Sequence, residues 1–372
     1  MEAYELIIEN KVKISPFDIV SVNDFQTHIG QNIDPNIVLE KPNLSLYCLD
    51  HANQRAIFIE TSPNVDLLQA PFYFIAQYEN AKKLIAMPYD TLHSLAKKVE
   101  VSQERIILFY STGRCGSTLI SKVMNLNPSV VSFSEPDIFS QLIMIRTAGQ
   151  STDAEVASLL YDSTMIMATN AQKQGYQYFA FKFRSYVLSV SDLLYQTIPK
   201  AKILFMYRNA LTWAYSFSHA FGSTDENMEE RLEKSGMRYM IPSVNKHLKT
   251  HNNSISWVEY VAHMWVSTMQ DSRSLQQQGA VLGFARFEDL KATPQAIIHS
   301  LLTHCELPMP EPEKLTDILA KDSQAGTAGA QDRQKPARRL TDTDLVELER
   351  VIREIDSSLS PDTVLQYSNT VA

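Results

Sequence analysis

The sequence predicts an α/β fold, with a parallel sheet covered by helices on both faces and a small N-terminal α+β region before it. From residue 101 onward, short continuous apolar runs alternate with helical patterns, as expected for strands that are buried on both faces. The polar, glycine-containing stretch STGRCGST (111–118) separates one such run from a helix. Residues 1–100 lack this alternation. We therefore expect an accessory region over 1–100 and a main α/β domain over 101–372.

The individual elements follow from apolar runs and helical periodicity. In the N-terminal region, strands are expected over 44–50 and 56–61, and a helix over 88–99. In the main domain, the expected strands are 105–110, 130–133, 178–183, 202–207 and 281–290. A helix should follow STGRCGST, and further helices are expected over 152–170, 188–196, 210–220, 256–277, 292–307 and from 341 onward. The polar segment 221–255 is interpreted as an insertion or lid.

Composition and charge exclude several classes of protein. The chain has 372 residues and a net charge of -8, without the basic balance of a nucleic-acid binder. Its three cysteines, Cys48, Cys115 and Cys305, are too few for a disulfide framework and suit a reducing compartment. The N-terminus has no signal-peptide pattern, and no apolar run is long enough to cross a membrane. These observations predict a cytoplasmic protein with no nucleic-acid partner and no membrane span, and they leave the oligomeric state open.

The stretch 111–118 is typical of a loop that binds an anion. Between a strand and a helix, such a loop points successive backbone N–H groups at the ligand, and the helix N-terminus adds partial positive charge. Gly113 and Gly116 permit the necessary backbone angles, and Arg114 adds a fixed positive charge. Ser117 and Thr118 add hydroxyl donors. A tight turn with two glycines is the structural alternative. The loop lacks the Gly-Lys-Ser/Thr ending of a Walker A motif, which disfavours a P-loop kinase or nucleotide hydrolase without excluding either.

A second candidate element is MYRNALTWAYSFSHAF (206–221). Arg208 stands at the end of an expected strand, where open α/β sheets bind ligands, and Ser216 follows eight residues later within the next helix. Taken alone, Arg208 fits a surface ion pair equally well. Its significance comes from its combination with the loop at 111–118.

Together these motifs resemble the sulfotransferases that use 3′-phosphoadenosine 5′-phosphosulfate (PAPS). RIILFYSTGRCGSTLISKVMNLNP is similar to their 5′-phosphosulfate loop, MYRNALTWAYS to their Arg-x₇-Ser 3′-phosphate element, and FARFEDLKATPQAIIHSLLTHCEL to a later strand and helix. The resemblance covers roughly 101–310 and implies a P-loop-like phosphosulfate loop. The residues that it assigns to PAPS are Gly113, Arg114, Cys115, Gly116, Ser117, Thr118, Arg208 and Ser216. Cys115 departs from the family pattern, in which Ser is commoner, but it can still present its backbone N–H.

Sulfuryl transfer to a hydroxyl group also needs a base and cations that neutralise the leaving group. Glu135 is the predicted base, because it follows the strand at 130–133 and its distance from Arg114 resembles that of the catalytic Glu of the tyrosylprotein branch. A position beside the loop strand would bring it to the same edge of the sheet. A solvated or helix-capping carboxylate is the structural alternative. Asp137 is a second candidate base, and His219 ranks below both.

Arg114 is the first expected cation near the leaving group, and Lys182 is the second. Arg184 lies two residues from Lys182 on what is predicted to be the same strand face, so spacing alone does not choose between them. An ordinary salt bridge is an equally good interpretation of either. In the basic loop 322–339, Arg333 and Lys335 are weak candidates for contact with the 3′-phosphate. No Cys/His spacing suggests a metal site, so no metal is expected.

The sequence leaves the acceptor open. A small-molecule or saccharide hydroxyl is expected, and residues 214–265 supply aromatic and Met side chains that could shape its pocket. A catalytically inactive relative that only binds the nucleotide is the non-enzymatic alternative. The expected activity is PAPS-dependent sulfuryl transfer.

Overall fold

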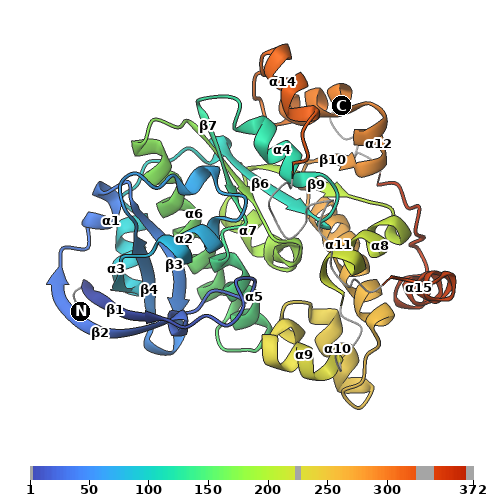
Figure 1. Ribbon diagram of the computed structural model, residues 1–372, viewed down its shortest axis with the longest axis horizontal. Coiled ribbons are helices and arrows are strands. Elements are labelled where there is room, and N and C mark those ends of the chain that lie inside the picture. Colours follow the sequence, from blue (N-terminus) through green and yellow to red (C-terminus); the bar gives the residue numbers. More distant parts are fainter. Residues whose placement is uncertain (1–2, 223–227, 324–338, 366–372) are drawn as a thin grey trace. The chain divides into compact units, whose positions relative to one another are not determined.

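The structure is a computed structural model, which describes residues 3–222, 228–323 and 339–365 (Figure 1). The chain forms two compact units. The first unit comprises 1–107, 128–183 and 193–201, and the second comprises 108–127, 184–192 and 202–372. The division falls within the strand that precedes the glycine-containing loop, so each unit is described by itself.

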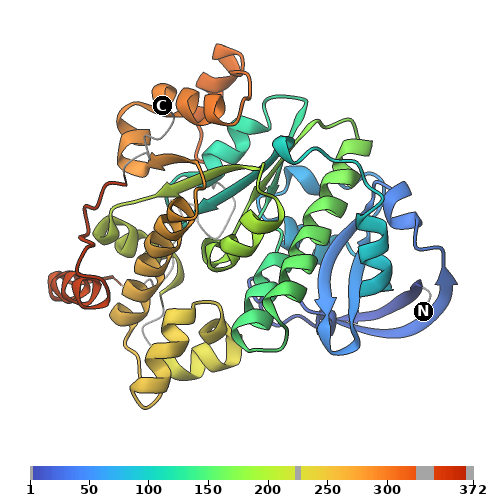
Figure 2. The same ribbon diagram turned by 180° about the vertical axis from the view of Figure 1, so that it is seen from behind.

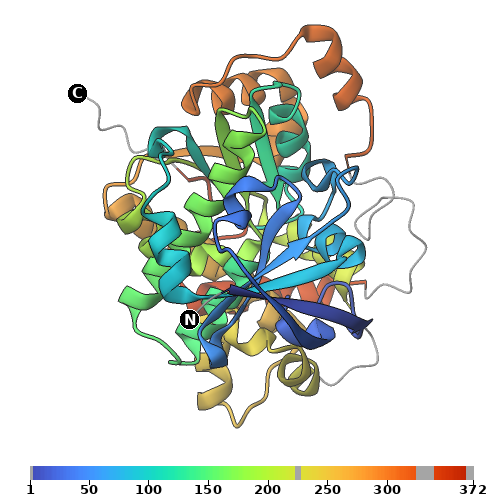
Figure 3. The same cartoon turned by 90° about the vertical axis from the view of Figure 1, so that its left-hand side faces the viewer.

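The first unit contains an antiparallel five-stranded sheet with the strand order β2-β1-β5-β4-β3 (Figure 3). The strands are β1 (Ala3–Lys11), β2 (Phe25–Ile33), β3 (Leu44–Asp50), β4 (Arg55–Glu60) and β5 (Lys83–Pro88). This sheet confirms the small N-terminal α+β region. The sequence predicted β3 and β4 but missed the other three strands. In β1 and β2 most side chains are partly or fully exposed, so these strands lack the continuous apolar run that marks a buried strand.

Helices of the first unit pack against this sheet and against each other. Short helices α1 (Ile37–Glu40), α2 (Tyr73–Asn80) and α3 (Tyr89–Ala96) accompany it. The longer helices α5 (Ile138–Thr147) and α6 (Asp153–Lys173) pack on β3 (Figure 2). The apolar core of this region contains Phe25, Tyr47, Ile57 and Phe74, each at most 5% exposed. Residues far apart in sequence therefore share one core in this unit.

The second sheet has the strand order β10-β9-β6-β8-β7. Its strands are β6 (Ile106–Ser111), β7 (Val130–Ser134), β8 (Tyr178–Lys182), β9 (Lys202–Tyr207) and β10 (Leu282–Arg286). The pairs β9–β10 and β7–β8 are parallel. The predicted α/β class with a parallel sheet is confirmed. The expected neighbour relation between β6 and β7 is wrong, because β8 lies between them. A crossover helix does not force strands that are consecutive in sequence to pair.

The second unit is largely helical. Its helices are α4 (Ser117–Met124), α8 (Ala210–Phe221), α9 (Met228–Ser235), α10 (Pro242–Thr250), α11 (Trp257–Gln277), α12 (Phe287–Ala292), α13 (Pro294–His304), α14 (Pro312–Leu319) and α15 (Asp342–Ile355). Helix α7 (Ser191–Thr197) crosses the division and follows a 3₁₀ segment, Ser185–Val190, so the predicted helix at 188–196 is only partly α-helical. Within the polar segment 221–255, the described residues include helices α9 and α10.

The predicted strand over 281–290 is wrong beyond residue 286. Helix α12 begins at Phe287, with Glu288 and Asp289 in its first turn. Acidic side chains in a first turn are stabilised by the partial positive charge of the helix N-terminus. The chain therefore leaves the sheet at the point where its side chains become acidic. Among the described residues, no helix is long and apolar enough to cross a membrane.

Helix α11 supplies a test of local stability. Its N-cap Ser256 accepts a hydrogen bond from the Glu259 backbone N–H at 3.1 Å, and the Glu259 carboxylate accepts one from the Ser256 N–H at 2.7 Å. We expect Ser256→Ala to lower the free energy of unfolding by about 1 kcal/mol, because it leaves an N–H group at the helix start without its partner. Chemical denaturation measures this loss. Ser256→Thr keeps the accepting oxygen and should remain near the parent value, and equal losses in the two variants would refute the capping role.

Candidate functional site

The loop between β6 and α4 has an unusual backbone. Gly113, Arg114 and Gly116 have φ values of 73°, 51° and 85°, in the left-handed region. Arg114 is not glycine, and such a conformation at a residue with a side chain stores strain that functional sites often tolerate. Turns that enter the left-handed region can point successive N–H groups toward one concave side, where an anion can bind. Gly116 is also the N-cap of α4, so the helix dipole acts at the same place.

Neighbouring elements of the second unit hold this loop in shape. The Gly113 N–H donates to Ser111 Oγ at 3.2 Å, and the Thr112 N–H donates to the Met206 carbonyl in β9 at 3.0 Å. From α8, the indole N–H of Trp213 donates to the Thr112 carbonyl at 2.9 Å. The loop conformation therefore depends on β9 and α8 as well as on the two glycines.

Arg114, Arg208 and Ser216, which the sequence analysis singled out, lie together in the second unit. Arg114 Nε donates to Ser216 Oγ at 3.2 Å, across 102 residues of sequence. Arg208 Nη1 donates to the carbonyl oxygen of Arg114 at 3.2 Å. The two guanidinium groups and the hydroxyl group of Ser216 thus meet beside the loop.

Two like charges share this site. Burial lowers the pKa of Arg114, and repulsion from Arg208 lowers it further. Burial also lowers the pKa of Arg208, while Glu288 opposes that change. Both guanidinium groups remain protonated at neutral pH, because an arginine pKa starts far above it. Holding two partly buried positive charges together is unfavourable in the free protein, and an anion between them would relieve the repulsion.

Three further side chains position Arg208. Its guanidinium lies over the Phe287 ring, 4.4 Å from the centroid, and its Nε donates to Thr212 Oγ1 at 3.0 Å. The Trp265 indole N–H donates to the Arg208 carbonyl at 2.9 Å. The sequence analysis missed these roles. The role of Thr212 could have been predicted, because Thr212 lies four residues after Arg208 at the start of a helix. Phe287 and Trp265 could not have been predicted, because only the tertiary fold brings them to Arg208.

The other residues of the loop are buried or half-buried. Cys115 is fully buried, and its thiol donates to the Met206 carbonyl at 3.5 Å. The side chain therefore packs inward, and its thiol is not available to a ligand. Ser117 is 5% exposed, and its hydroxyl accepts a hydrogen bond from Ser111 Oγ at 3.4 Å. Thr118 is half-buried in the first turn of α4.

Glu135 and Lys182 lie together in the first unit. The Lys182 side chain is almost completely buried, and its ammonium group forms an ion pair with the Glu135 carboxylate. The Glu135 N–H also donates to the Lys182 carbonyl at 2.7 Å, just beyond the end of the β7–β8 ladder. Glu135 has a φ of 61°, again in the left-handed region. A buried ammonium group needs a partner, so this carboxylate has at least a structural task.

The alternative candidates have surroundings of their own. Asp137 is 1% exposed, and its Oδ2 accepts a hydrogen bond from the Val20 N–H at 3.0 Å. Strand β8 ends at Lys182, so the prediction that Arg184 shares a strand face with it is wrong. Arg184 instead lies directly before the following 3₁₀ segment as its N-cap, with its guanidinium 5.4 Å from the centroid of the Tyr186 ring. His219 is exposed in the last turn of α8.

Two other expectations concern charge and metal binding. Arg333 and Lys335 lie outside the described residues. Within the part of the chain that the structure describes, no group of three or more His, Cys, Asp or Glu side chains is arranged to hold a metal ion.

The chain is similar to several known proteins. Residues 104–340 match the family model described as "Sulfotransferase domain". Among solved structures, a sulfotransferase from Alicyclobacillus acidocaldarius is 13% identical, with a TM-score of 0.38 over 69% of this chain and 96% of that chain. A sulfotransferase from Mycobacterium avium is 10% identical, with a TM-score of 0.40 over 75% and 82% of the two chains. A sulfotransferase domain from the curacin biosynthetic pathway is 16% identical, with a TM-score of 0.36 over 67% and 96%. No curated protein sequence gives a significant match.

Gly116 provides a test of the loop. A Cβ atom at this position would lie 2.8 Å from Leu290 Cδ2, and its φ is +85°. Gly116→Ala should therefore combine backbone strain of about 1–2 kcal/mol with about 1–3 kcal/mol of overpacking. Thermal and chemical denaturation measure the combined loss of stability.

Gly149→Ala is the matched control. Gly149 also has a left-handed backbone, with a φ of +68°, but a Cβ atom added there would have nothing within 4 Å. That variant should show the backbone strain alone. If the two variants lost the same stability, close contact with Leu290 would not be a constraint on the loop.

Proposed function

The chain belongs to the sulfotransferase domain family, and from this premise we propose that it transfers the sulfuryl group of PAPS to a hydroxyl group of a small acceptor. The observation that carries the proposal is the convergence of Arg114, Arg208 and Ser216 beside a loop of left-handed backbone. Residues 101–372 would form the catalytic domain, with 1–100 as an accessory region. A saccharide hydroxyl belongs to the same proposed acceptor class.

The residues beside the loop fit the donor's charges. PAPS carries phosphate at two positions of its ribose and a sulfuryl group that is transferred to the acceptor. We propose that the backbone N–H groups of 113–118 and the Arg114 side chain hold the 5′ group, and that Arg208 and Ser216 hold the 3′-phosphate. Support comes from the burial of both guanidinium groups and from the repulsion that Arg208 exerts on Arg114, which a polyanion would offset. Cys115 would contribute only its backbone, since its thiol is buried.

For the chemistry, we propose Glu135 as the base and Lys182 as the second cation. The Glu135 carboxylate would accept the proton that the acceptor hydroxyl loses as its oxygen becomes bonded to sulfur. Lys182 would orient that carboxylate through their ion pair and supply positive charge to the leaving group. Arg114 would supply positive charge at the 5′ position. The backbone strain at Glu135 supports this assignment, because such conformations gather at functional sites.

Direct assay tests the proposal. The full chain is incubated with PAPS labelled in its sulfuryl group and with a cell extract, and the labelled product is identified. In parallel, adenosine 3′,5′-bisphosphate should raise the melting temperature in a concentration-dependent way. ATP with Mg²⁺ should not. Stabilisation by ATP and Mg²⁺ alone, without sulfuryl transfer, would favour a kinase or hydrolase instead. Stabilisation by the bisphosphate without a labelled product would favour an inactive relative.

Arg208 gives the sharpest test of donor binding. Arg208→Ala should weaken the binding of adenosine 3′,5′-bisphosphate far more than the binding of adenosine 5′-phosphosulfate, because the latter has no 3′-phosphate. A charge-assisted contact contributes roughly 1.5–3 kcal/mol, so a loss of about ten- to a hundredfold is expected. Isothermal titration calorimetry measures both affinities. Arg273→Ala is the control, because Arg273 lies on α11 and donates to Ser358 Oγ. Equal losses for both nucleotides would mean that Arg208 acts through its hydrogen bond to the Arg114 carbonyl, and they would reject its direct assignment to the 3′-phosphate.

Glu135 gives the test of catalysis. Glu135→Gln should leave nucleotide affinity nearly intact and lower turnover by about 10²–10⁴-fold, because the amide cannot accept the proton at neutral pH. It should also lower stability, since Lys182 loses the charge of its partner. Turnover and melting temperature are therefore measured on the same preparation, below the onset of melting. Asp137→Asn removes a neighbouring carboxylate but retains an acceptor for the Val20 N–H, so it should keep its turnover.

The double variant Glu135→Gln/Lys182→Met separates catalysis from ion pairing. It removes the uncompensated buried charge, so its melting temperature should recover toward the parent value. Its turnover should stay low, because both proposed catalytic groups are absent. Recovery of turnover together with stability would mean that the pair is only structural.

A further inference from the structure

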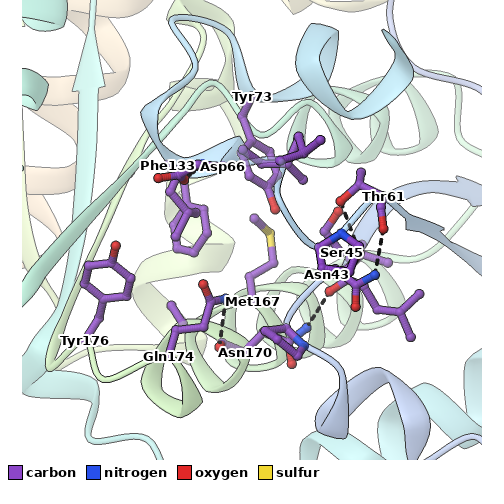
Figure 4. A pocket seen from close by; sticks show the side chains of 18 of the residues that line it. Asn43, Ser45, Thr61, Asp66, Tyr73, Phe133, Met167, Asn170, Gln174 and Tyr176 are labelled. Carbon is purple, nitrogen blue, oxygen red and sulfur yellow. Dashed lines mark hydrogen bonds between the residues drawn. The ribbon is translucent and has the colours of Figure 1, made fainter. Parts of the chain in front are cut away.

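The first unit contains a pocket that the proposed function does not use. Its volume is about 220 Å³ (Figure 4). It is bounded by the start of β3, the segment after β4, the end of α6, and single residues of α2 and β7. Its described polar and aromatic lining residues are Asn43, Ser45, Thr61, Asn64, Asp66, Tyr73, Phe133, Asn170, Gln174 and Tyr176. Much of this lining comes from the accessory region.

One side of the pocket is a rigid network of neutral hydrogen-bonding groups. Asn43 Nδ2 donates to the Thr61 carbonyl at 2.6 Å. Ser45 Oγ accepts a hydrogen bond from Gln77 Nε2 at 2.8 Å, and Gln77 is 1% exposed. Figure 4 shows Asn43, Ser45 and Thr61 grouped on this side. In these contacts, neutral groups of the wall are hydrogen-bonded to other neutral groups of the protein. They therefore shape the wall of the pocket and supply no charge.

The other side combines aromatic rings with a carboxylate. Figure 4 shows Asp66, Phe133 and Tyr176 together on that side. The Tyr73 and Phe133 rings pack edge to face with centroids 5.6 Å apart. Burial raises the pKa of Tyr176, and the Asp66 carboxylate, which lines the same pocket, raises it further. Burial raises the pKa of Tyr73 to about 12, so its hydroxyl stays protonated.

The orientation of Asp66 is fixed by the backbone. Its Oδ1 accepts a hydrogen bond from the Leu68 N–H at 3.0 Å, at the start of a short 3₁₀ turn. Asp66 is the only formally charged side chain among the lining residues of this pocket, all of which the structure describes, and none of them is a Lys or Arg. The lining therefore repels anions, in contrast to the two arginines beside the loop at 113–118.

From this combination we infer that the pocket binds a small alkylammonium ion. The aromatic rings of Tyr73, Phe133 and Tyr176 line the pocket and can attract a cation through their quadrupoles, and the Asp66 carboxylate supplies the opposite charge. The volume is that of about seven water molecules, which admits a ligand of roughly seven non-hydrogen atoms. Binding of an alkylammonium ion here is separate from sulfuryl transfer, and the inference does not depend on the proposed donor or acceptor.

Three probes of nearly equal shape and different charge test the inference on the full chain. They are choline (positive), 3,3-dimethylbutan-1-ol (neutral) and 3,3-dimethylbutanoate (negative). Calorimetric titrations at constant ionic strength should show saturable binding of choline, with an affinity at least about tenfold above that of the neutral alcohol. The carboxylate should bind more weakly than either. Equal binding of choline and the alcohol, or no saturable binding of choline, would overturn the inference.

Single-residue variants test whether choline binds in this pocket. Asp66→Asn retains an oxygen for the Leu68 N–H but removes the charge, so it should fold normally and lose about tenfold or more in choline affinity. Tyr176→Leu should lose about two- to fivefold, as expected for one cation–π contact. Asp34→Asn is the matched control, since Asp34 likewise accepts a backbone N–H two residues on, from Asn36 at 3.0 Å, but does not line the pocket. Unchanged affinity in Asp66→Asn, or an equal loss in Asp34→Asn, would overturn the inference.

Discussion

The hydrogen bond from Arg208 to the carbonyl oxygen of Arg114 is the contact on which the anion-binding arrangement depends. It joins the end of β9 to a loop residue whose φ is 51°, and it directs two positive charges to one place. Burial lowers the pKa of both arginines, and repulsion from Arg208 lowers that of Arg114 further. Trp265, Thr212 and Phe287 all restrain Arg208, so α8, α11 and α12 contribute to the same contact. The helices of the second unit thereby preorganise charge before any ligand arrives, which reduces the reorganisation that binding requires.

The ion pair between Lys182 and Glu135 imposes a different constraint in the first unit. A buried ammonium group is unfavourable without a negative partner, and Glu135 meets this need with its backbone in the left-handed region. The parallel pairing of β7 and β8 places the two residues where the ladder ends. If Glu135 accepts a proton during turnover, its partner becomes an uncompensated charge at that moment.

The sequence predicted those features that depend on local backbone chemistry. The glycines and Arg114 of the loop, and the spacing between Arg208 and Ser216, could be read directly, because each belongs to one strand–helix junction. Phe287 was missed because it reaches Arg208 from an element far along the chain, and the same segment was misread as strand. The order of β6, β8 and β7 could not be predicted, since a parallel crossover can skip a position. Strands β1 and β2 escaped prediction because polar side chains and irregular register interrupt their alternation.

The distribution of charge also shows why a net charge of -8 says little about ligands. The loop in the second unit gathers two arginines, whereas the pocket in the first unit has one carboxylate among neutral amides and aromatic rings. At physiological salt, exposed charges are screened beyond about 8 Å, so each site responds mainly to its own nearest groups. The loop therefore favours anions in a chain that is acidic as a whole, and the pocket disfavours the same anions. Selectivity for opposite charges thus arises within one chain from local placement of a few side chains, and the overall balance of acidic and basic residues does not determine it.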